Sequence, residues 1–140
     1  MAKLFKFEII TPERVFYSDE VEMVVFNTPD GEMGLLADHS PMLIANAICT
    51  VRILKDGKEE LASIGEGFFE ITASGVNAVV DTAEWSHEID VERAKKAKER
   101  AEELLKSNKH DLEMEMMLKA SIQRANTRIR TAEAKDQTLN

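Results

Sequence analysis

The sequence predicts two domains: an all-β antiparallel sandwich over residues 1–85, followed by an α-helical antiparallel hairpin over residues 86–140. Two observations support this prediction. All six glycines and all three prolines lie before Trp85, so the residues that favour turns end there. Up to that point apolar and polar residues tend to alternate, as in strands with one buried face, whereas beyond it apolar residues recur every three or four positions, as in helices.

Short strands account for the first 85 residues. Phe5, Phe7 and Ile9 alternate with polar neighbours, which predicts a strand with one buried face. The Asp56-Gly57 pair is a strong signal for a hairpin turn. Strands about every ten residues with turns between them are typical of an antiparallel sandwich or barrel. The other strands are expected around residues 15–17, 21–26, 51–53, 61–64, 69–71 and 76–80.

Two helices of about five turns each are expected between about residues 90 and 134, separated by polar residues 107–111. Asp90 is placed to cap the first helix, and Ile89 before it to pack on Ala94. The apolar stripe of the first helix is mostly alanine. Alanine buries little apolar surface, so we expect the hairpin to be held weakly and to move.

Composition narrows the classes of function. With 140 residues and 44% hydrophobic content the chain suits a globular protein with a real core. We expect neither a signal peptide nor a membrane anchor, because the N-terminal residues mix acid and base among apolar ones and no apolar run is long enough to cross a membrane. The net charge of -8 argues against nucleic acid or anionic lipid as a partner. Residues 1–85 hold 15 acids and 6 bases, whereas residues 86–140 hold 11 acids and 12 bases, so an anion should be recognised in the second part.

Arginines of the two predicted helices are expected to lie on the same flank of the hairpin. In an antiparallel hairpin that turns near Asn108, Arg93 lies level with Arg124, and Arg128 lies level with Ile89. At 100° per residue, each of these arginines lies on the same side of the apolar stripe of its own helix. When the two stripes face each other, this places all of the arginines on one flank of the hairpin. The flank consists of Arg93, Arg100, Arg124 and Arg128.

Guanidinium groups gathered on one flank repel one another unless an anion joins them, and their planar shape fits phosphate oxygens. Arg93 also lies in the first turn of its helix, where a cation opposes the helix dipole. The sequence therefore predicts a polyphosphate ligand. An alternative stays open, in which Glu84, Glu88 or Asp90 neutralises the arginines or they form a solvated face. The sequence lacks a glycine-rich phosphate loop, which excludes a nucleotide hydrolase of the usual type.

Other reactive side chains give no further site. The three histidines lack the spacing of metal ligands, the serines show no arrangement that predicts a nucleophile, and Cys49 fits a core position. We therefore assign no catalytic residue and no metal. Met114, Met116 and Met117 are interpreted as adaptable packing at a surface that separates and re-forms.

The chain carries Thr11-Pro12, the run from Gly31 to Leu36, the triplet His39-Ser40-Pro41, and a two-helix tail. Together these motifs resemble the epsilon subunit of bacterial F-type ATP synthase. The most specific piece is Ile89, Asp90, Arg93 and Ala94, which matches the nucleotide-binding motif of those epsilon subunits that bind ATP.

The resemblance implies a regulatory ATP site. In it, Ile89, Asp90 and Ala94 would surround the base, and Arg93 would meet the phosphates. The remaining members of the site would be Glu84, Arg100, Arg124 and Arg128. The subunit would not be an enzyme by itself and would require no cofactor, with ATP as its regulatory ligand.

The resemblance also implies partners. The sandwich would grip the gamma subunit, and a loop would face the rotor ring of c subunits; that loop comprises Asp30, Gly31, Glu32, Met33 and Gly34. The hairpin would extend into the catalytic alpha/beta head and block ATP hydrolysis. The protein would lie at the cytoplasmic face of the bacterial membrane as a peripheral subunit. Two rivals remain: a free-standing ATP sensor, and a structural adaptor whose hairpin pairs with a partner coiled coil.

Overall fold

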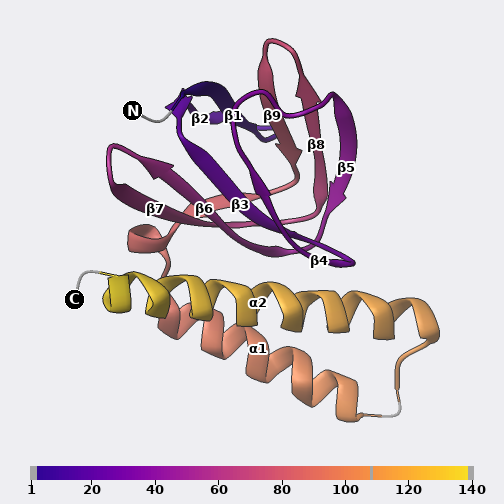
Figure 1. Cartoon of the computed structure of the whole chain (residues 1–140). Helices are drawn as coiled ribbons and strands as arrows, with labels where there is room; N and C mark the ends of the chain where they lie inside the picture. The colour runs from indigo at the N-terminus through magenta and orange to yellow at the C-terminus, as the bar shows by residue number, and fades with distance from the viewer. Residues whose placement is uncertain (1–2, 108, 139–140) are drawn as a thin grey trace. The chain divides into compact units, whose positions relative to one another are not determined.

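The computed structural model describes residues 3–107 and 109–138, with side chains described as far as residue 134 (Figure 1). The chain divides into two compact units, residues 1–85 and 86–140. The first is built from strands in two sheets, and the second contains two helices that run side by side in opposite directions. The predicted fold class, an all-β sandwich followed by a helical hairpin, is confirmed.

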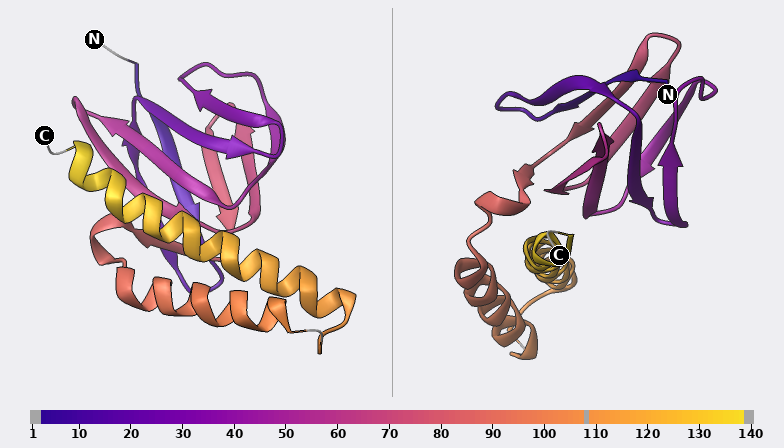
Figure 2. Two further views of the ribbon diagram at one scale, coloured as in Figure 1. Left: turned by 90° about the horizontal axis from the view of Figure 1, so that it is seen from below. Right: turned by 60° about the vertical axis from the view of Figure 1, so that its left-hand side comes forward.

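One sheet has five strands in the order β2-β1-β9-β8-β5. Its neighbouring strands are antiparallel except β1 and β9, which are parallel and pair Phe7 with Val76. The first strand of the chain therefore lies inside the sheet rather than at its edge (Figure 2). The strands are β1 (Phe5–Ile10), β2 (Val15–Val21), β5 (Met42–Asn46), β8 (Gly67–Thr72) and β9 (Gly75–Val80).

The other sheet has the order β10-β7-β6-β3-β4 and is antiparallel throughout. Asp56 and Gly57 join β6 to β7, both with positive φ (53° and 73°), as a two-residue hairpin of the mirror-image type requires. The hairpin predicted from this pair is confirmed. The strands are β3 (Met23–Thr28), β4 (Gly31–Leu35), β6 (Cys49–Lys55), β7 (Lys58–Ile64) and β10 (Ala83–Trp85).

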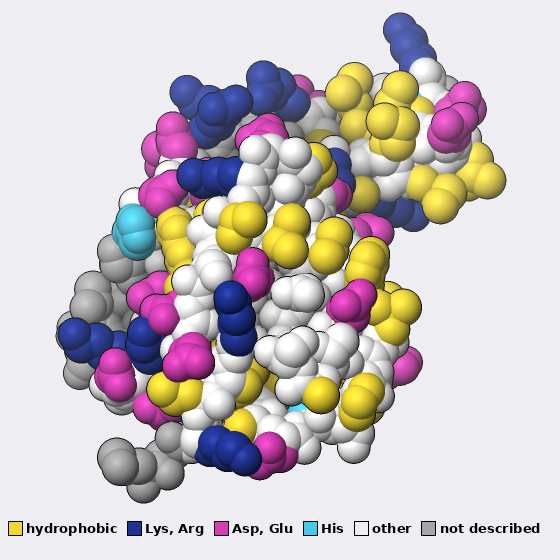
Figure 3. Space-filling view, turned by 90° about the horizontal axis from the view of Figure 1, so that it is seen from above, with side chains coloured by type: hydrophobic (Ala, Val, Ile, Leu, Met, Phe, Trp, Pro, Cys, Tyr) yellow, Lys and Arg dark blue, Asp and Glu magenta, His cyan; other side chains and the backbone are white. Residues whose placement is uncertain are grey.

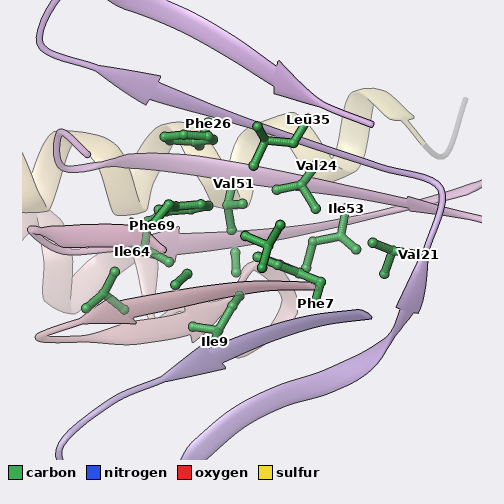
Figure 4. Close-up of a cluster of buried hydrophobic side chains, with 14 of the residues drawn as sticks. Phe7, Ile9, Val21, Val24, Phe26, Leu35, Val51, Ile53, Ile64 and Phe69 are labelled. Carbon is green, nitrogen blue, oxygen red and sulfur yellow. The ribbon is translucent and has the colours of Figure 1, made fainter. Parts of the chain in front are cut away.

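The core of the sandwich is filled by alternate residues of both sheets. Phe26 and Phe69 stack with centroids 3.8 Å apart and rings within 7° of parallel, and Phe7 lies 6.1 Å from Phe69 (Figure 4). All three rings are fully buried. The free thiol of Cys49 belongs to the same core, and burial raises its pKa, as expected for a packing residue rather than a nucleophile.

Aromatic rings close one edge of the sandwich. Trp85 of β10 stacks on Phe16 of β2, with centroids 4.6 Å apart, and meets Tyr17 edge-on at 5.6 Å. These contacts join an edge strand of one sheet to an edge strand of the other. Burial, with smaller contributions from Glu60 and Asp19, raises the pKa of Tyr17 to about 12.

The helical unit consists of a short 3-10 helix, η1 (Ser86–Glu88), and two α-helices, α1 (Val91–Lys106) and α2 (Leu112–Thr138). We expected five turns in each; α1 has 16 residues and α2 has 27, or about 24 and 40 Å at 1.5 Å per residue. α1 ends at Lys106, just before polar residues 107–111, whereas α2 continues to Thr138 with neither glycine nor proline. Within the described residues no helix is both long and apolar enough to span a membrane.

Candidate functional site

Asp90 fixes the start of α1. Its Oδ1 accepts a hydrogen bond from the Arg93 backbone N–H at 3.0 Å, and its backbone carbonyl accepts one from the Ala94 N–H at 3.0 Å. The predicted cap is confirmed. Ala94 is buried, Ile89 is half-buried, and Arg93 is exposed. The cap therefore holds Arg93 at a defined place in the first turn, with its side chain in solvent.

The exposed face of α1 carries a shallow hollow of about 480 Å³. Arg93 and Arg100, seven residues apart, both line it, as their helical spacing predicts. Lys96 lies between them, and four carboxylates complete the lining: Asp90, Glu92, Glu99 and Glu103. With four acids against three bases, the hollow alone does not favour a polyphosphate, which would need further cations.

Arg124 and Arg128, the candidates for those cations, lie on α2 and do not line the hollow. Both are half-buried. Arg124 donates a hydrogen bond from Nη2 to the Ser121 hydroxyl at 3.2 Å, within its own helix. The structure thus places Arg93 and Arg100 at one hollow and Arg124 and Arg128 on the neighbouring helix, and a site shared by all four stays a prediction.

Glu84 belongs to a different unit from the other predicted ATP-site residues. It lies in β10 and is paired with Ser63 of β7, so the sandwich holds its backbone. The remaining seven predicted residues lie in the helical unit. A site that includes both Glu84 and the arginines would draw on both units, and it stays a prediction.

Of the loop predicted to face a rotor ring, only Asp30 lies in the turn between β3 and β4. Gly31, Glu32, Met33 and Gly34 belong to β4 and pair with β3, so the prediction of a loop over these four residues is wrong. The Thr28 hydroxyl donates to the Gly31 carbonyl at 3.0 Å and accepts from the Asp30 N–H at 3.1 Å, which tightens the turn. Gly31 has a φ of 135°, a conformation that favours glycine. Asp30, Gly31, Glu32 and Gly34 are exposed, whereas Met33 packs against the core. Four of the five predicted contact residues are therefore accessible to a partner.

An apolar row, not expected from the sequence, crosses the outer face of the first sheet. The register pairs Val15 with Ile10, Ile10 with Val79, Val79 with Phe68, and Phe68 with Ala45, so these five residues adjoin across all five strands. Val15, Phe68 and Val79 are each more than a third exposed. Outer faces of sandwiches are usually polar, so this row indicates a surface that another protein covers. Consecutive Phe68 and Phe69 were the available signal, since only one of them can face the core.

A second exposed apolar surface, here called the hairpin tip, lies where α1 ends and α2 begins. Its members are Leu104, Leu112, Met114, Met116 and Met117, all exposed. At 100° per residue, the four from α2 point to several sides of that helix. A helix that is apolar on several sides is typically buried by other protein. Figure 3 shows how hydrophobic side chains gather on the surface of the molecule among charged ones.

The comparisons with known proteins agree over most of the chain. Residues 4–86 match the family model for the β-sandwich domain of the ATP synthase delta/epsilon chain, and residues 87–133 match the model for its long α-helix domain. The ATP synthase epsilon chain of Caldicellulosiruptor bescii is 42% identical over 129 residues, covering 92% of this chain and 93% of the relative. That of Desulforamulus reducens is 38% identical over 133 residues, covering 95% and 100%.

Solved structures agree in fold. A chain of the Euglena gracilis mitochondrial ATP synthase, in a structure of OSCP, F1 and the c-ring, superposes with a TM-score of 0.76 at 21% identity, covering 98% of this chain and 82% of that one. A chain of the Tetrahymena thermophila mitochondrial enzyme, in a structure of its central stalk and c-ring, gives 0.61 at 12% identity, covering 94% and 98%. The family models and the curated relatives confirm the resemblance found in the sequence: the chain belongs to the epsilon-chain family of ATP synthase, whose members are non-catalytic subunits of that complex.

Proposed function

We propose that this chain couples the gamma subunit of ATP synthase to the rotor ring of c subunits and restrains ATP hydrolysis through its helical hairpin, with ATP as the regulatory ligand. The observation that carries the regulatory part is the hairpin tip: five large apolar side chains exposed at one end of two helices. Such a surface is costly to leave in water and is explained by a state in which a partner buries it.

The apolar row on the outer face of the first sheet is proposed to bind the gamma subunit. It runs from Val15 to Ala45 across five strands, and Phe68, a large aromatic side chain, stands within it. Aromatic residues in apolar patches commonly supply most of the binding energy of an interface. The β3–β4 hairpin, with the exposed carboxylates of Asp30 in its turn and Glu32 in β4, is proposed to meet the rotor ring.

The hairpin is proposed to move because the apolar stripe of α1 consists mostly of small side chains. Ala94 and Ala101 are its buried residues, and Ala97 is half-buried. Each alanine buries little surface, and at about 25 cal/mol per Å² the stripe contributes little free energy. Separating α1 from its surroundings therefore costs little free energy, and burial of the hairpin tip in the alpha/beta head would offset that cost.

ATP is proposed to stabilise the closed state of the hairpin, in which the hairpin tip is not inserted into the alpha/beta head. Arg93 and Arg100 contribute two guanidinium groups to the hollow, but the carboxylates of the hollow offset their positive charge. Arg124 and Arg128 would supply the additional positive charge that the phosphates of ATP need. A ligand that binds only the closed state favours it by about 2.7 kcal/mol at a hundredfold excess over Kd. As part of ATP synthase, the chain is proposed to lie peripherally at the cytoplasmic face of the membrane.

Calorimetry of ATP with the full chain tests the nucleotide site. We expect heat of binding with the wild type, and loss of it with Arg93→Ala. The matched control is Arg130→Ala, because Arg130 is exposed and, at 100° per residue, points about 120° away from Arg124 and about 160° away from Arg128 on the same helix. The absence of heat and of a thermal shift with the wild type at millimolar ATP would refute the ATP site and leave the rotary role standing.

Binding to gamma tests the rotary role and separates it from the free-standing sensor and the adaptor. Phe68→Glu places a charge in the apolar row and is expected to weaken binding by about thirtyfold, the scale of losing an interface hot spot. Leu36→Glu is the matched control, an exposed apolar residue outside the row. Failure of the wild-type chain to bind gamma would rule out the central-stalk role.

A further inference from the structure

The hairpin tip contains three thioethers within four residues of α2. The fractional exposures of Met114, Met116 and Met117 are 46%, 66% and 59%. Met42 is 38% exposed, while Met23 and Met33 are half-buried and Met33 packs against the core. Among the described methionines, the three most exposed are therefore those of the hairpin tip.

We propose that Met114, Met116 and Met117 form an oxidation site for peroxides, and that their conversion to sulfoxides releases the restraint exerted by the hairpin. In each step the thioether sulfur attacks one oxygen of hydrogen peroxide and the O–O bond breaks. Sulfur is oxidised to the sulfoxide, and peroxide is reduced to water. Hydrogen peroxide is neutral, so the neighbouring carboxylates of Asp111, Glu113 and Glu115 do not repel it.

The consequence follows from polarity, and this part rests on the proposed function. A sulfoxide carries a strong dipole and a hydrogen-bond acceptor, both of which cost free energy when buried without a partner. At 100° per residue, Met114 and Met117 lie about 60° apart on one side of α2, whereas Met116 lies at least about 100° from both. The three sulfurs therefore cover two sides of the helix, and a partner that encloses the start of α2 covers at least one of them. Oxidation therefore disfavours the buried state of the hairpin tip while the core of the sandwich stays intact.

Peptide mass spectrometry of the full chain, sampled during exposure to hydrogen peroxide, tests the site. We expect Met116 and Met117 to gain oxygen first, Met114 next, and Met23 and Met33 last. Oxidation of Met23 or Met33 at the rate of the tip methionines would overturn the assignment. This measurement requires no partner, so it stands whether or not the hairpin restrains hydrolysis.

Hydrolysis by ATP synthase reconstituted with this chain tests the consequence. Peroxide-treated chain is expected to restrain hydrolysis about tenfold less well than untreated chain, from the cost of burying an unpaired polar group. Treatment with methionine sulfoxide reductases should restore it. The control replaces all three methionines, by Met114→Leu, Met116→Leu and Met117→Leu, a swap that conserves volume and resists oxidation. Equal restraint by treated and untreated wild type would refute the switch, whereas no restraint by untreated chain would refute the proposed function instead.

Discussion

Two glycines two residues apart, Gly65 and Gly67, provide a sharp test of the sandwich. At Gly67, a Cβ would overlap the backbone carbonyl oxygen of Val79 and lie 2.7 Å from the Cα of Val80. At Gly65, it would overlap a carboxylate oxygen of Asp81 and lie 2.7 Å from the Thr82 hydroxyl. The two overlaps are similar in size, but the first obstacle is backbone and the second consists of exposed side chains.

Gly67→Ala should therefore destabilise the sandwich far more than Gly65→Ala. Ordinary contact begins at 3.4 Å, so β8 and β9 must separate by at least about 0.7 Å to clear the Cα of Val80, and by more to clear the Val79 carbonyl oxygen, within a pairing that both strands need. Overpacking against a fixed neighbour typically costs about 1–3 kcal/mol, and we expect the upper part of that range for Gly67→Ala. For Gly65→Ala the side chains of Asp81 and Thr82 rotate away, and we expect a cost under about 1 kcal/mol.

Urea unfolding followed by tryptophan fluorescence measures the difference. Trp85 is the one tryptophan of the sequence, and its stacking on Phe16 makes its emission a probe of the sandwich. The midpoint should fall clearly for Gly67→Ala and little for Gly65→Ala. Equal midpoints for the two variants would show that the β8–β9 backbone yields as readily as a surface side chain, and the reasoning would be wrong.

Two further predictions concern the helix caps and the buried edge. Asp90→Ala removes the acceptor for the Arg93 N–H and should destabilise α1 by about 1 kcal/mol, so the helical circular dichroism signal should be lost at a lower temperature. Asp111→Ala, which removes the equivalent bond to the Met114 N–H, is the matched comparison. An unchanged melting curve in both variants would contradict the capping argument. Burial favours the neutral phenol of Tyr17, so the contribution of Tyr17 to stability should be constant below pH 10 and fall between pH 10 and about 12, as the unfolded chain ionises first. Absorbance at 295 nm reports this ionisation directly because the sequence has a single tyrosine, and a native midpoint near 10 would contradict the burial of the ring.

The sequence predicted local structure correctly where one or two residues determine it. Asp56-Gly57 predicted its hairpin because both positions need positive φ, and Asp90 predicted the start of α1 because a carboxylate there accepts a free amide. Strands β4, β5 and β10 were missed. β4 contains two glycines, β5 is a short run without alternation, and β10 has three residues, so none shows the period of a strand.

The candidate site was only partly predictable, because helical spacing describes one helix at a time. It places Arg93 and Arg100 on one side of α1, and the structure agrees. The same spacing places Glu103, three residues after Arg100, beside it, so part of the negative charge of the hollow was also predictable. It does not reveal that these side chains line one hollow, nor that Arg124 bonds to Ser121. Those facts depend on side-chain conformations, which periodicity does not determine.

The parallel pairing of β1 with β9 governs the order of assembly. Phe7 and Val76 are partners although about seventy residues separate them, so closing this contact requires a long loop and a large loss of chain entropy. Sheets that depend on such distant contacts fold late and slowly. During synthesis the first strand must wait, unpaired on one side, until nearly the whole sandwich has emerged. A chain beginning at Thr11 would lack the strand that joins β2 to β9, and the sheet would be divided in its interior rather than trimmed at its margin.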